Sequence, residues 1–379
     1  MVPALLGGGP LFSTHKPTSG LHTPDRHSFF RYLKRVYDTG FRQGTLTAEL
    51  EERLAYSHGT KHCVTFCNGL WAIITCMYSL AVPGKDEVIM PSFTYRRMGD
   101  AAEWAWLTPH YCDIDKKLVA CPVTIEPCIN KNTGLILITQ PMINCVPYGS
   151  LQAIARYYNI PIMFDSVEVG WGGFHDGRLV GSFGNAECFS LHASKLINGF
   201  EGGYVTTNDS ALAKTLTKRR QERNQLVMNE THAAMALANL DELDQYMKHN
   251  EENYKEYHFL LQTTLGLRVW EQRYFARCGY KNVVLEVEED FPLTRDELLQ
   301  VLNLENILAR PYYPKPLHLR QTHYQTIYGS LPTTEWAKDR FILLPTGDFV
   351  SRRDVTDIGY FLRGIKDYAD DIKTVLGRG

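Results

Sequence analysis

The chain has 379 residues, of which 44% are hydrophobic and 22% charged, and its formal net charge is −2. This near-neutral balance gives no electrostatic basis for binding nucleic acid or an anionic membrane surface, so neither partner is expected. No apolar run is long enough for a membrane-spanning helix, and the first residues, MVPALLGGGPLF, are too short and glycine-broken for a signal peptide.

The nine cysteines are scattered along the chain. None of them shows C-x-x-C spacing or histidine partners at the spacing of metal ligands, so no metal site is predicted. We expect reduced core residues of a cytoplasmic protein.

Strands and helices alternate through the first half of the sequence. The expected elements are helices at 29–37 and 46–56, a strand at 63–66, a helix at 70–81, a strand at 87–91, a helix ending at 106, strands at 108–114 and 135–140, a helix at 150–158 and a strand ending at Asp165. This alternation predicts an α/β fold whose sheet is mostly parallel and sandwiched by helices.

In the second half of the chain, the pattern changes beyond a long helical tract. A strand-like run ends at Lys195, and an extended segment at 202–208, a helix at 210–222 and a long helical tract at 229–264 follow. Beyond the tract we expect strands at 267–271, 282–288 and 307–313, a helix at 294–302 and a closing helix at 353–366. We therefore predict a large domain over residues 1–245, N-terminal segment included, and a smaller α+β domain over 246–379.

Lys195 is the first candidate for chemistry. It follows a buried strand, is flanked by the small residues Ala193 and Ser194, and precedes a glycine-containing turn. An amine held where water is scarce is a competent nucleophile for forming a Schiff base. Most lysines are solvated surface charges, so this lysine alone decides little.

Asp165 is the second candidate. It ends a short buried strand, and ligands of open α/β sheets sit at the carboxyl ends of strands. An aspartate at this place can keep a pyridinium nitrogen protonated, which pyridoxal 5′-phosphate (PLP) requires to act as an electron sink. The alternative for Asp165 alone is a helix N-cap. An aspartate after one strand, with a lysine after a later strand, is typical of PLP enzymes of the aspartate-aminotransferase fold.

A phosphate site is predicted where the strand at 63–66 turns into the next helix. Asn68-Gly69 forms this turn, and the free backbone N–H groups at a helix N-terminus bind anions. Many strand–helix turns contain Asn-Gly, so this signal is modest.

Nearly the whole chain resembles the DegT/StrS-type sugar aminotransferases, a family of PLP-dependent transferases of fold type I. The segment GRLVGSFGNAECFSLHASKLINGFEGG matches the family's lysine segment almost throughout, and IPIMFDSVEVG matches its aspartate-bearing strand. Further similar segments are GKDEVIMPSFTY, MNETHAAMALANLDELD, ARPYYPKPLH and LPTTEWAKDRFILLP.

The resemblance implies PLP as cofactor and assigns roles to individual residues. Lys195 is expected to hold the cofactor and move the substrate proton, and Asp165 to bond the pyridinium nitrogen. Tyr95 is expected to stack on the ring, and Ser190 to donate to the phosphate. The implied cofactor-binding set is Asn68, Gly69, Leu70, Tyr95, Asp165, Glu168, Ser190, Lys195, Asn224 and Gln225.

Asn224 and Gln225 are the two candidates for an asparagine that, in this family, reaches the phosphate from the neighbouring subunit. The resemblance therefore implies a homodimer with shared active sites.

The sequence departs from the family pattern around the cofactor. Leu70 replaces the usual threonine of the phosphate loop, and QPMINCVPYG replaces a His-x-x-Gly loop. Glu168 stands where glutamine or histidine faces the phenolic oxygen, so its carboxylate would repel that oxygen unless it is protonated or turned elsewhere. Arg96 and Arg97 replace small residues.

The two arginines and His318 are candidate contacts to the substrate. Guanidinium groups can clamp a carboxylate or phosphate with two hydrogen bonds. Ion pairs of Arg96 or Arg97 with acids such as Asp100 or Glu103 are an equally good interpretation.

These observations predict an aminotransferase that moves an amino group from glutamate or glutamine to a keto group of a nucleotide-linked deoxysugar or related polyol. A dehydratase branch of the family has histidine in place of the lysine, and Lys195 argues against it. The alternatives are a PLP enzyme of the same fold with another reaction outcome, on an amino acid or biosynthetic intermediate, and a non-catalytic regulator or scaffold. The intact Asp165 and Lys195 argue against the regulator or scaffold.

Overall fold

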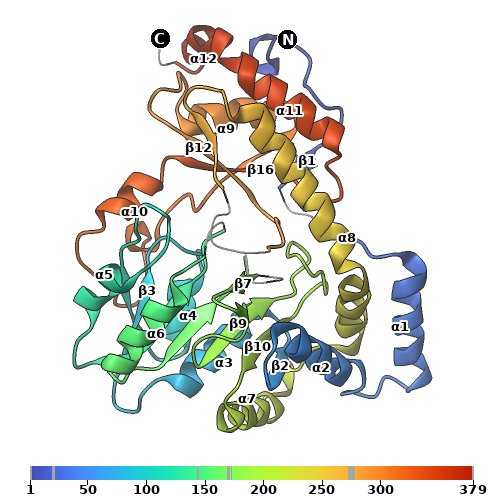
Figure 1. The fold of residues 1–379 in the computed structure, drawn as a ribbon, viewed down its shortest axis with the longest axis vertical. Coiled ribbons are helices and arrows are strands. Elements are labelled where there is room, and N and C mark those ends of the chain that lie inside the picture. The colour runs from blue at the N-terminus through green and yellow to red at the C-terminus, as the bar shows by residue number, and fades with distance from the viewer. Residues whose placement is uncertain are drawn as a thin grey trace.

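The structure, a computed structural model, describes residues 2–18, 22–142, 145–168, 171, 173–271 and 278–377. Within these residues an eight-stranded sheet forms the larger, lower body in Figure 1, with the strand order β15-β4-β3-β5-β6-β9-β10-β2. The strands are β2 (His62–Phe66), β3 (Glu87–Pro91), β4 (Thr108–Cys112), β5 (Thr133–Thr139), β6 (Ile162–Asp165), β9 (Ala186–Ser190), β10 (Gly203–Thr207) and β15 (Ile327–Tyr328).

All neighbouring strands from β15 to β9 pair in parallel, whereas β10 is antiparallel to both β9 and β2. The predicted fold class, α/β with a mostly parallel sheet between helices, is confirmed. The covering helices are α1 (Arg26–Asp38), α2 (Leu46–His58), α3 (Gly69–Leu80), α4 (Met98–Trp104), α5 (Pro122–Ile125), α6 (Tyr148–Tyr157) and α7 (Ser210–Glu222).

The apolar strands supply two separate cores because their side chains alternate between the faces of the sheet. On β5, Leu135 and Leu137 pack with the residues of α3 and α4, whereas Ile136 and Ile138 pack with those of α2 and α6. All four side chains are fully buried, and each contributes roughly 1.5–3 kcal/mol relative to an exposed position.

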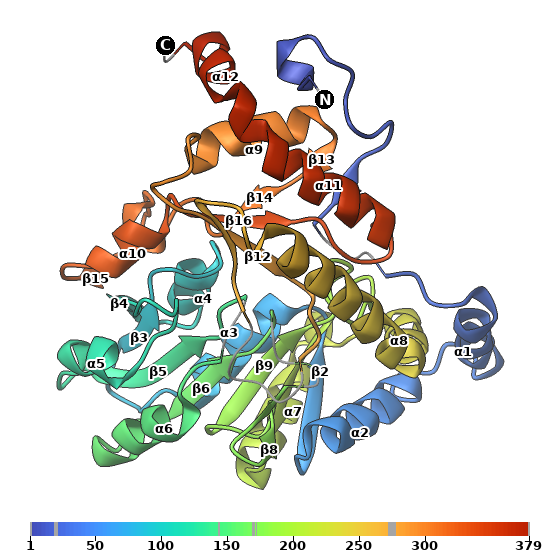
Figure 2. The same ribbon diagram turned by 45° about the horizontal axis from the view of Figure 1, so that its top comes forward.

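A second sheet of four antiparallel strands, in the order β11-β12-β16-β14, forms the upper body (Figure 2). Its strands are β11 (Leu267–Val269), β12 (Val283–Val287), β14 (Arg310–Pro311) and β16 (Phe341–Leu344). It shares a core with α9 (Arg295–Leu304), α11 (Arg352–Gly364) and α12 (Ala369–Val375). Helix α9 begins at a capping box in which Thr294 and Glu297 satisfy each other's backbone N–H groups.

The N-terminal segment belongs to this upper body. Strand β1 (Lys16–Pro17) pairs in parallel with β13 (Ile307–Leu308), and Phe12 is buried in the small core. The Glu305 carboxylate accepts hydrogen bonds from the backbone N–H groups of Ala4 (2.6 Å) and Leu11 (2.7 Å). Both termini therefore lie at the same end of the molecule (Figures 1 and 2).

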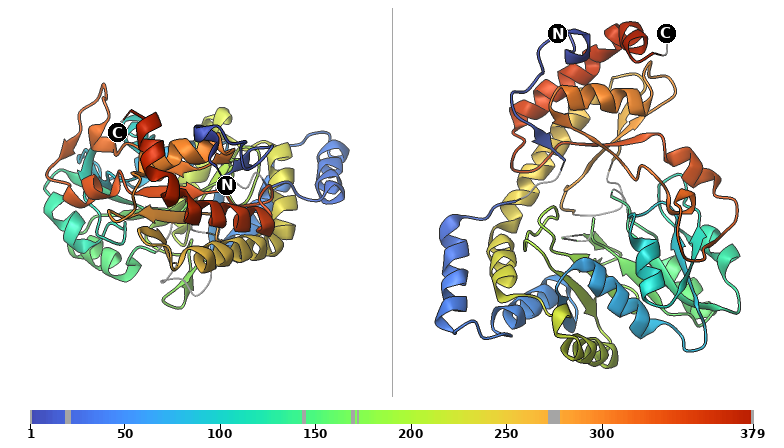
Figure 3. Two further views of the ribbon diagram at one scale, coloured as in Figure 1. Left: turned by 90° about the horizontal axis from the view of Figure 1, so that it is seen from above. Right: turned by 180° about the vertical axis from the view of Figure 1, so that it is seen from behind.

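The 32-residue helix α8 (Glu230–Leu261) joins the two bodies and carries α1 along its outer side (Figure 3). Its first half packs in the core of the large sheet, and Tyr254, Tyr257 and Leu261 pack in the small core. The division into 1–245 and 246–379 remains a proposal, since the helix runs unbroken through it and β15 returns from the C-terminal part to the large sheet.

Several elements differ from the predictions. The strand expected at 307–313 is divided into β13 and β14, because the first piece pairs with β1 and the second with β16. The helix expected to close the chain is followed by α12. Helix α10 (Pro332–Ala337) and the short hairpin β7 (Phe174–His175) and β8 (Arg178–Leu179) were not predicted. No helix in the described part of the chain is long and apolar enough to cross a membrane.

Candidate active site

Most of the predicted site residues line a cavity of about 460 Å³ at the carboxyl ends of the parallel strands. Thr139, Asp165 and Ser190 are the last residues of β5, β6 and β9, so the three neighbouring strands end at this cavity. The lining residues are Asn68, Gly69, Leu70, Ile73, Tyr95, Arg97, Thr139, Asp165, Val167, Glu168, Ser190, His192, Ser194, Lys195, Glu201 and Tyr313.

Asp165 is 4% exposed, and its Oδ1 accepts a hydrogen bond from the backbone N–H of Val167 (3.2 Å). Burial raises the pKa of its carboxyl to about 7, although the Val167 N–H and the charge of Lys195 oppose the rise. A buried carboxyl that accepts a single backbone hydrogen bond is suited to a cationic partner inside the cavity.

Lys195 lies in the loop between β9 and β10. Its backbone N–H bonds the carbonyl of His192 (2.8 Å), and Leu191 N bonds the carbonyl of Gly202 (2.8 Å), so the loop is folded back on itself. Its side chain is 19% exposed and lies against Glu168. Asp165 and Lys195 thus line the same cavity, as the sequence predicted.

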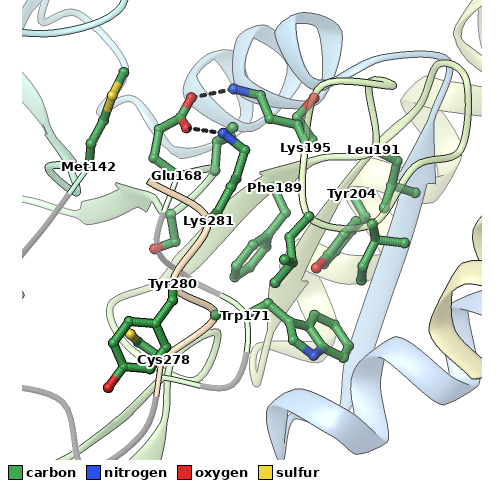
Figure 4. A pocket seen from close by; sticks show the side chains of 16 residues that line it. Met142, Glu168, Trp171, Phe189, Leu191, Lys195, Tyr204, Cys278, Tyr280 and Lys281 are labelled. Atoms are coloured by element: carbon green, nitrogen blue, oxygen red, sulfur yellow. Dashed lines mark hydrogen bonds and ion pairs between the residues drawn. The ribbon is translucent and has the colours of Figure 1, made fainter. Parts of the chain in front are cut away.

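Glu168 contacts two lysines, as Figure 4 shows. Its Oε1 accepts a hydrogen bond from Lys195 Nζ, and its Oε2 lies 3.0 Å from Nζ of Lys281, from the loop that precedes β12. Burial alone would raise the pKa of this carboxyl, but the two ammonium groups hold it far below its usual value. The Glu168 carboxylate is thus directed toward the two lysines.

The first turn of α3 packs closely against the end of β9 and the start of β10. Asn68 caps this helix, since its Oδ1 accepts a hydrogen bond from Trp71 N (2.9 Å). A Cβ at Gly69 would stand 2.8 Å from Cβ of Ser190, and a Cβ at Gly203 would stand 2.4 Å from Cα of Gly69. Helix α3 and the strands β9 and β10 can therefore meet here only where these positions are glycine.

Tyr95 and the arginines lie near the mouth of the cavity. Tyr95 lines the cavity and is 46% exposed. Arg97 also lines it, while its Nε lies 3.0 Å from Oδ2 of Asp100, so the predicted ion pair within this helix is present. Arg96 is exposed and is not among the lining residues.

His318 lies outside the cavity. Its Nδ1 is 2.7 Å from Oγ of Ser92, and its Nε2 is 2.6 Å from Oε1 of Glu335. Both ring nitrogens are engaged by the protein itself, and a contact of His318 with substrate remains a prediction.

Asn224 and Gln225 form a short 3₁₀ turn (Asn224–Leu226) after α7 and are exposed. They do not line the cavity of their own chain. This position is compatible with the expected role only if they reach a second subunit's cavity.

Sequence reasoning missed several lining residues. Tyr313 comes from the segment after β14 and is 8% exposed, and Thr139 Oγ1 accepts a hydrogen bond from Thr94 Oγ1 (2.8 Å). Lys281 had no local sequence signal, because it contacts Glu168 only through the tertiary fold. Glu201 and His192 pair at 3.6 Å, and the family-like E-G-G segment could have suggested Glu201.

The described residues contain no group of three or more histidine, cysteine, aspartate or glutamate side chains placed to hold a metal ion. A smaller cavity of about 30 Å³, drawn in Figure 4, adjoins the main one through Glu168 and Lys195 and is also lined by Lys281.

Comparisons with known proteins agree with this geometry. Residues 25–363 match the model of the DegT/DnrJ/EryC1/StrS aminotransferase family. The chain is 26% identical to dTDP-4-amino-4,6-dideoxy-D-glucose transaminase of Shigella dysenteriae over 304 residues, which cover 76% of this chain and 82% of the relative. It is 25% identical to GDP-perosamine synthase of Caulobacter vibrioides over 328 residues, 82% of this chain and 88% of the relative.

A solved structure is also similar over almost the whole chain. It is the crystal structure of DesI in the presence of its TDP-sugar product, with 27% identity and a TM-score of 0.91. The match covers 99% of both chains, so both bodies and their arrangement have counterparts in that protein.

Proposed function

Because the chain belongs to the DegT/DnrJ/EryC1/StrS aminotransferase family, whose members use PLP, we propose that it transfers an amino group to a keto group of a nucleotide-linked deoxysugar or related polyol. Glutamate or glutamine is the proposed donor. The similarity to two relatives named for amino-sugar nucleotides and to a structure holding a TDP-sugar supports this substrate class.

The residues around the cavity fit the parts of PLP. Asp165 is a buried acid whose carboxylate accepts a hydrogen bond from one backbone N–H group. A protonated ring nitrogen would give it a cationic partner. The first turn of α3, with the backbone N–H groups of Gly69 and Leu70, offers donors for a phosphate, and Ser190 adds a hydroxyl beside them. Tyr95 presents a flat ring at the same cavity.

The bound cofactor delocalises the negative charge that develops when a proton leaves the substrate carbon. Asp165 would keep a proton on the ring nitrogen, because its carboxylate would accept a hydrogen bond from that N–H group. Lys195 Nζ would take the proton from the substrate carbon and return it elsewhere, as a general base and then a general acid. The donor and the acceptor bind in turn, which predicts ping-pong kinetics.

The observation that carries this proposal is the placement of Asp165 and Lys195 on one cavity beside a helix N-terminus. Purified protein with added PLP should show a visible absorption band that borohydride abolishes and that glutamate or glutamine converts. Lys195→Ala, the control, should lack the borohydride-sensitive band.

Keto sugar nucleotides should then restore the band and yield the amino sugar, detected by mass spectrometry. A wild-type protein without any visible band would contradict PLP dependence. A band that responds to amino acids but transfers no amino group to any keto sugar would contradict the substrate class.

We further propose a homodimer that works in the cytoplasm. The exposed Asn224 and Gln225, which lie outside their own cavity, support a site shared between subunits. All nine cysteines are free thiols, which supports a reducing compartment. Light scattering on the eluting protein tests the dimer, and fractionation of expressing cells tests the location.

A further inference from the structure

The Glu168 carboxylate connects the two bodies of the molecule next to the proposed catalytic lysine. It belongs to the loop after β6, whereas Lys281 belongs to the segment that enters β12 (Figure 4). Lys281 Nζ lies 3.0 Å from Oε2 of Glu168 and 3.3 Å from Oδ1 of Asn282. The side chains of Lys281 and Glu168 are only 11% and 13% exposed.

This cluster contains one carboxylate and two amines, so one amine could be removed and the carboxylate would still have a partner. A single ion pair would need only Lys195. A second buried lysine is costly to desolvate, and burial does lower the pKa of Lys281, while Glu168 opposes this. The presence of Lys281 therefore indicates a role that Lys195 cannot fill.

Lys195 cannot be a constant partner of Glu168 in an aminotransferase. Its Nζ is the proposed attachment point of the cofactor and the proposed carrier of the substrate proton, so its charge changes during each turnover. A buried carboxylate that loses its cation takes up a proton instead of remaining charged. Glu168 would then switch between two charge states whenever Lys195 changes.

We propose that Lys281 is a positioning residue that keeps Glu168 ionised and directed at Lys195 throughout the reaction, an inference that rests on the proposed aminotransferase function. Lys281 acts only through Glu168. In return Lys195 faces a fixed negative charge, which favours the protonated state of its nitrogen after each proton transfer.

Other charged and titratable groups surround the cluster. Asp165 and Arg310 interact electrostatically with it, and His22 and Asp348 line a small cavity next to both lysines. Tyr312 and Tyr313 interact electrostatically with Glu168, and burial raises the pKa of both hydroxyls. Cys278 and Tyr280 precede Lys281 and have pKa values raised by burial to about 12.

The test compares Lys281→Gln, Lys281→Arg, Glu168→Gln and the double variant Glu168→Gln/Lys281→Gln in the PLP-loaded enzyme. Glutamine at 281 can still donate a hydrogen bond but carries no charge. The readout is the pH titration of the visible absorption band, which responds to charge beside the cofactor and not to general stability. Lys315→Gln removes a charge from an exposed position and serves as control.

In the wild type and in Lys281→Arg, Glu168 should stay ionised, and no step from it should appear between about pH 5 and 8. Lys281→Gln should show a new step in this range, and the double variant should lose it again. If Lys281→Gln fails to bind PLP while the double variant binds it, the unpaired Glu168 charge is the cause and the proposal is supported.

A Lys281→Gln enzyme that binds PLP and titrates like the wild type would overturn the proposal, as would a new step that persists without Glu168. Failure of the proposed function has a different signature, since the wild type would then show no visible band, or a band without amino transfer to any keto sugar, whatever the residue at 281.

Discussion

Asp165, at the end of β6, lies in register with Cys188 of the parallel neighbour β9. Strand β9 continues only to Ser190, and the loop that follows returns Lys195 to the edge at which β6 ends. Parallel pairing therefore brings an acid and an amine that are distant in the chain to one cavity. Between the two residues the chain returns from the end of β6 to the start of β9 and then runs along β9, which accounts for their separation in sequence.

We predict that Asp165→Asn causes a large loss of activity. Asparagine fills the same space but cannot keep a proton on a ring nitrogen, so the rate should fall by about 100-fold or more. Steady-state kinetics with a working donor and acceptor measure this, with circular dichroism to show that the fold is retained. Wild-type rates in this variant would contradict the assigned role.

The contact between Gly69 and Ser190 predicts weaker cofactor binding in Gly69→Ala. The added methyl group would stand 2.8 Å from Cβ of Ser190, so α3 must move away from the end of β9. The Kd for PLP should rise by about tenfold or more, corresponding to about 1.4 kcal/mol. Fluorescence titration measures it. Gly149→Ala in α6 is the matched control, since its Cβ meets only Asp176 Oδ2 at 4.0 Å, and an unchanged Kd in both variants would contradict the prediction.

Arg97 and Arg96 form a matched pair of neighbours, one at the cavity and one exposed. Arg97→Met should raise KM for the sugar substrate by about tenfold, because a charge-assisted hydrogen bond contributes roughly 1.5–3 kcal/mol. Arg96→Met should change KM by less than about twofold, as expected for a surface substitution. Equal effects of the two substitutions, or none, would leave Arg97 with its ion pair to Asp100 as its only role.

The buried carboxyl of Glu187 leads us to predict that the free energy of unfolding depends on pH, independently of the active site. Its Oε1 accepts hydrogen bonds from the backbone N–H groups of Gly181 and Phe183 (2.8 Å each), and its Oε2 from the hydroxyl of Ser166 (2.5 Å). Burial nevertheless raises the pKa of its carboxyl to about 7, above the usual 4.5. The folded chain then binds more protons than the unfolded chain between these values, so the free energy of unfolding falls as the pH rises through them.

Glu187→Gln keeps the same shape and removes this titration. The unfolding free energy of the variant minus that of the wild type, both without cofactor, should be roughly 1–3 kcal/mol larger at pH 8 than at pH 5. Urea unfolding at the two pH values measures the gain, and Glu52→Gln on the exposed side of α2 is the control. Asp165, whose raised pKa acts in the same direction, is unchanged in every sample. An equal difference at both pH values would contradict the prediction.

If Asn224 and Gln225 act in the partner's site, two variants that are each inactive alone should regain activity in a mixed dimer. A Lys195→Ala chain and an Asn224→Ala/Gln225→Ala chain, unfolded and refolded together, should form mixed dimers with one intact site. Random pairing gives about a quarter of the wild-type activity. Activity assays on mixed and unmixed samples measure the effect, and no recovery in verified mixed dimers would show that the two residues do not act across the interface.

Local patterns were sufficient to predict the strands β6 and β9, because each is a short apolar run that ends beside turn residues. Asp165 ends β6, whereas Lys195 lies in the loop beyond β9, and its expected role came from the resemblance to the family. Local patterns also predicted Asn68 and Gly69, whose cap and turn chemistry are local. The antiparallel β10 and the break at Ala309 could not be predicted in this way. They depend on pairing with strands distant in the chain, and a strand sequence does not specify its partners.

Lys281 shows the same limit in the site. Its contact with Glu168 spans 113 residues and arises because the small body closes over the end of β6. The unusual glutamate was visible in the sequence, but the cation that explains it was not. The partners of His318 could not be predicted for a related reason, since Ser92 and Glu335 come from two other segments.

The attachment of the N-terminal segment to Glu305 has a consequence for synthesis on the ribosome. Ala4 is made 301 residues before its partner, and Phe12 is made before every other buried residue of the small core. The large sheet can assemble while translation continues, but the first residues must wait, unpaired, until almost the whole polypeptide has emerged. A bulky fusion at the start of the chain would therefore disturb the last step of folding and not the first.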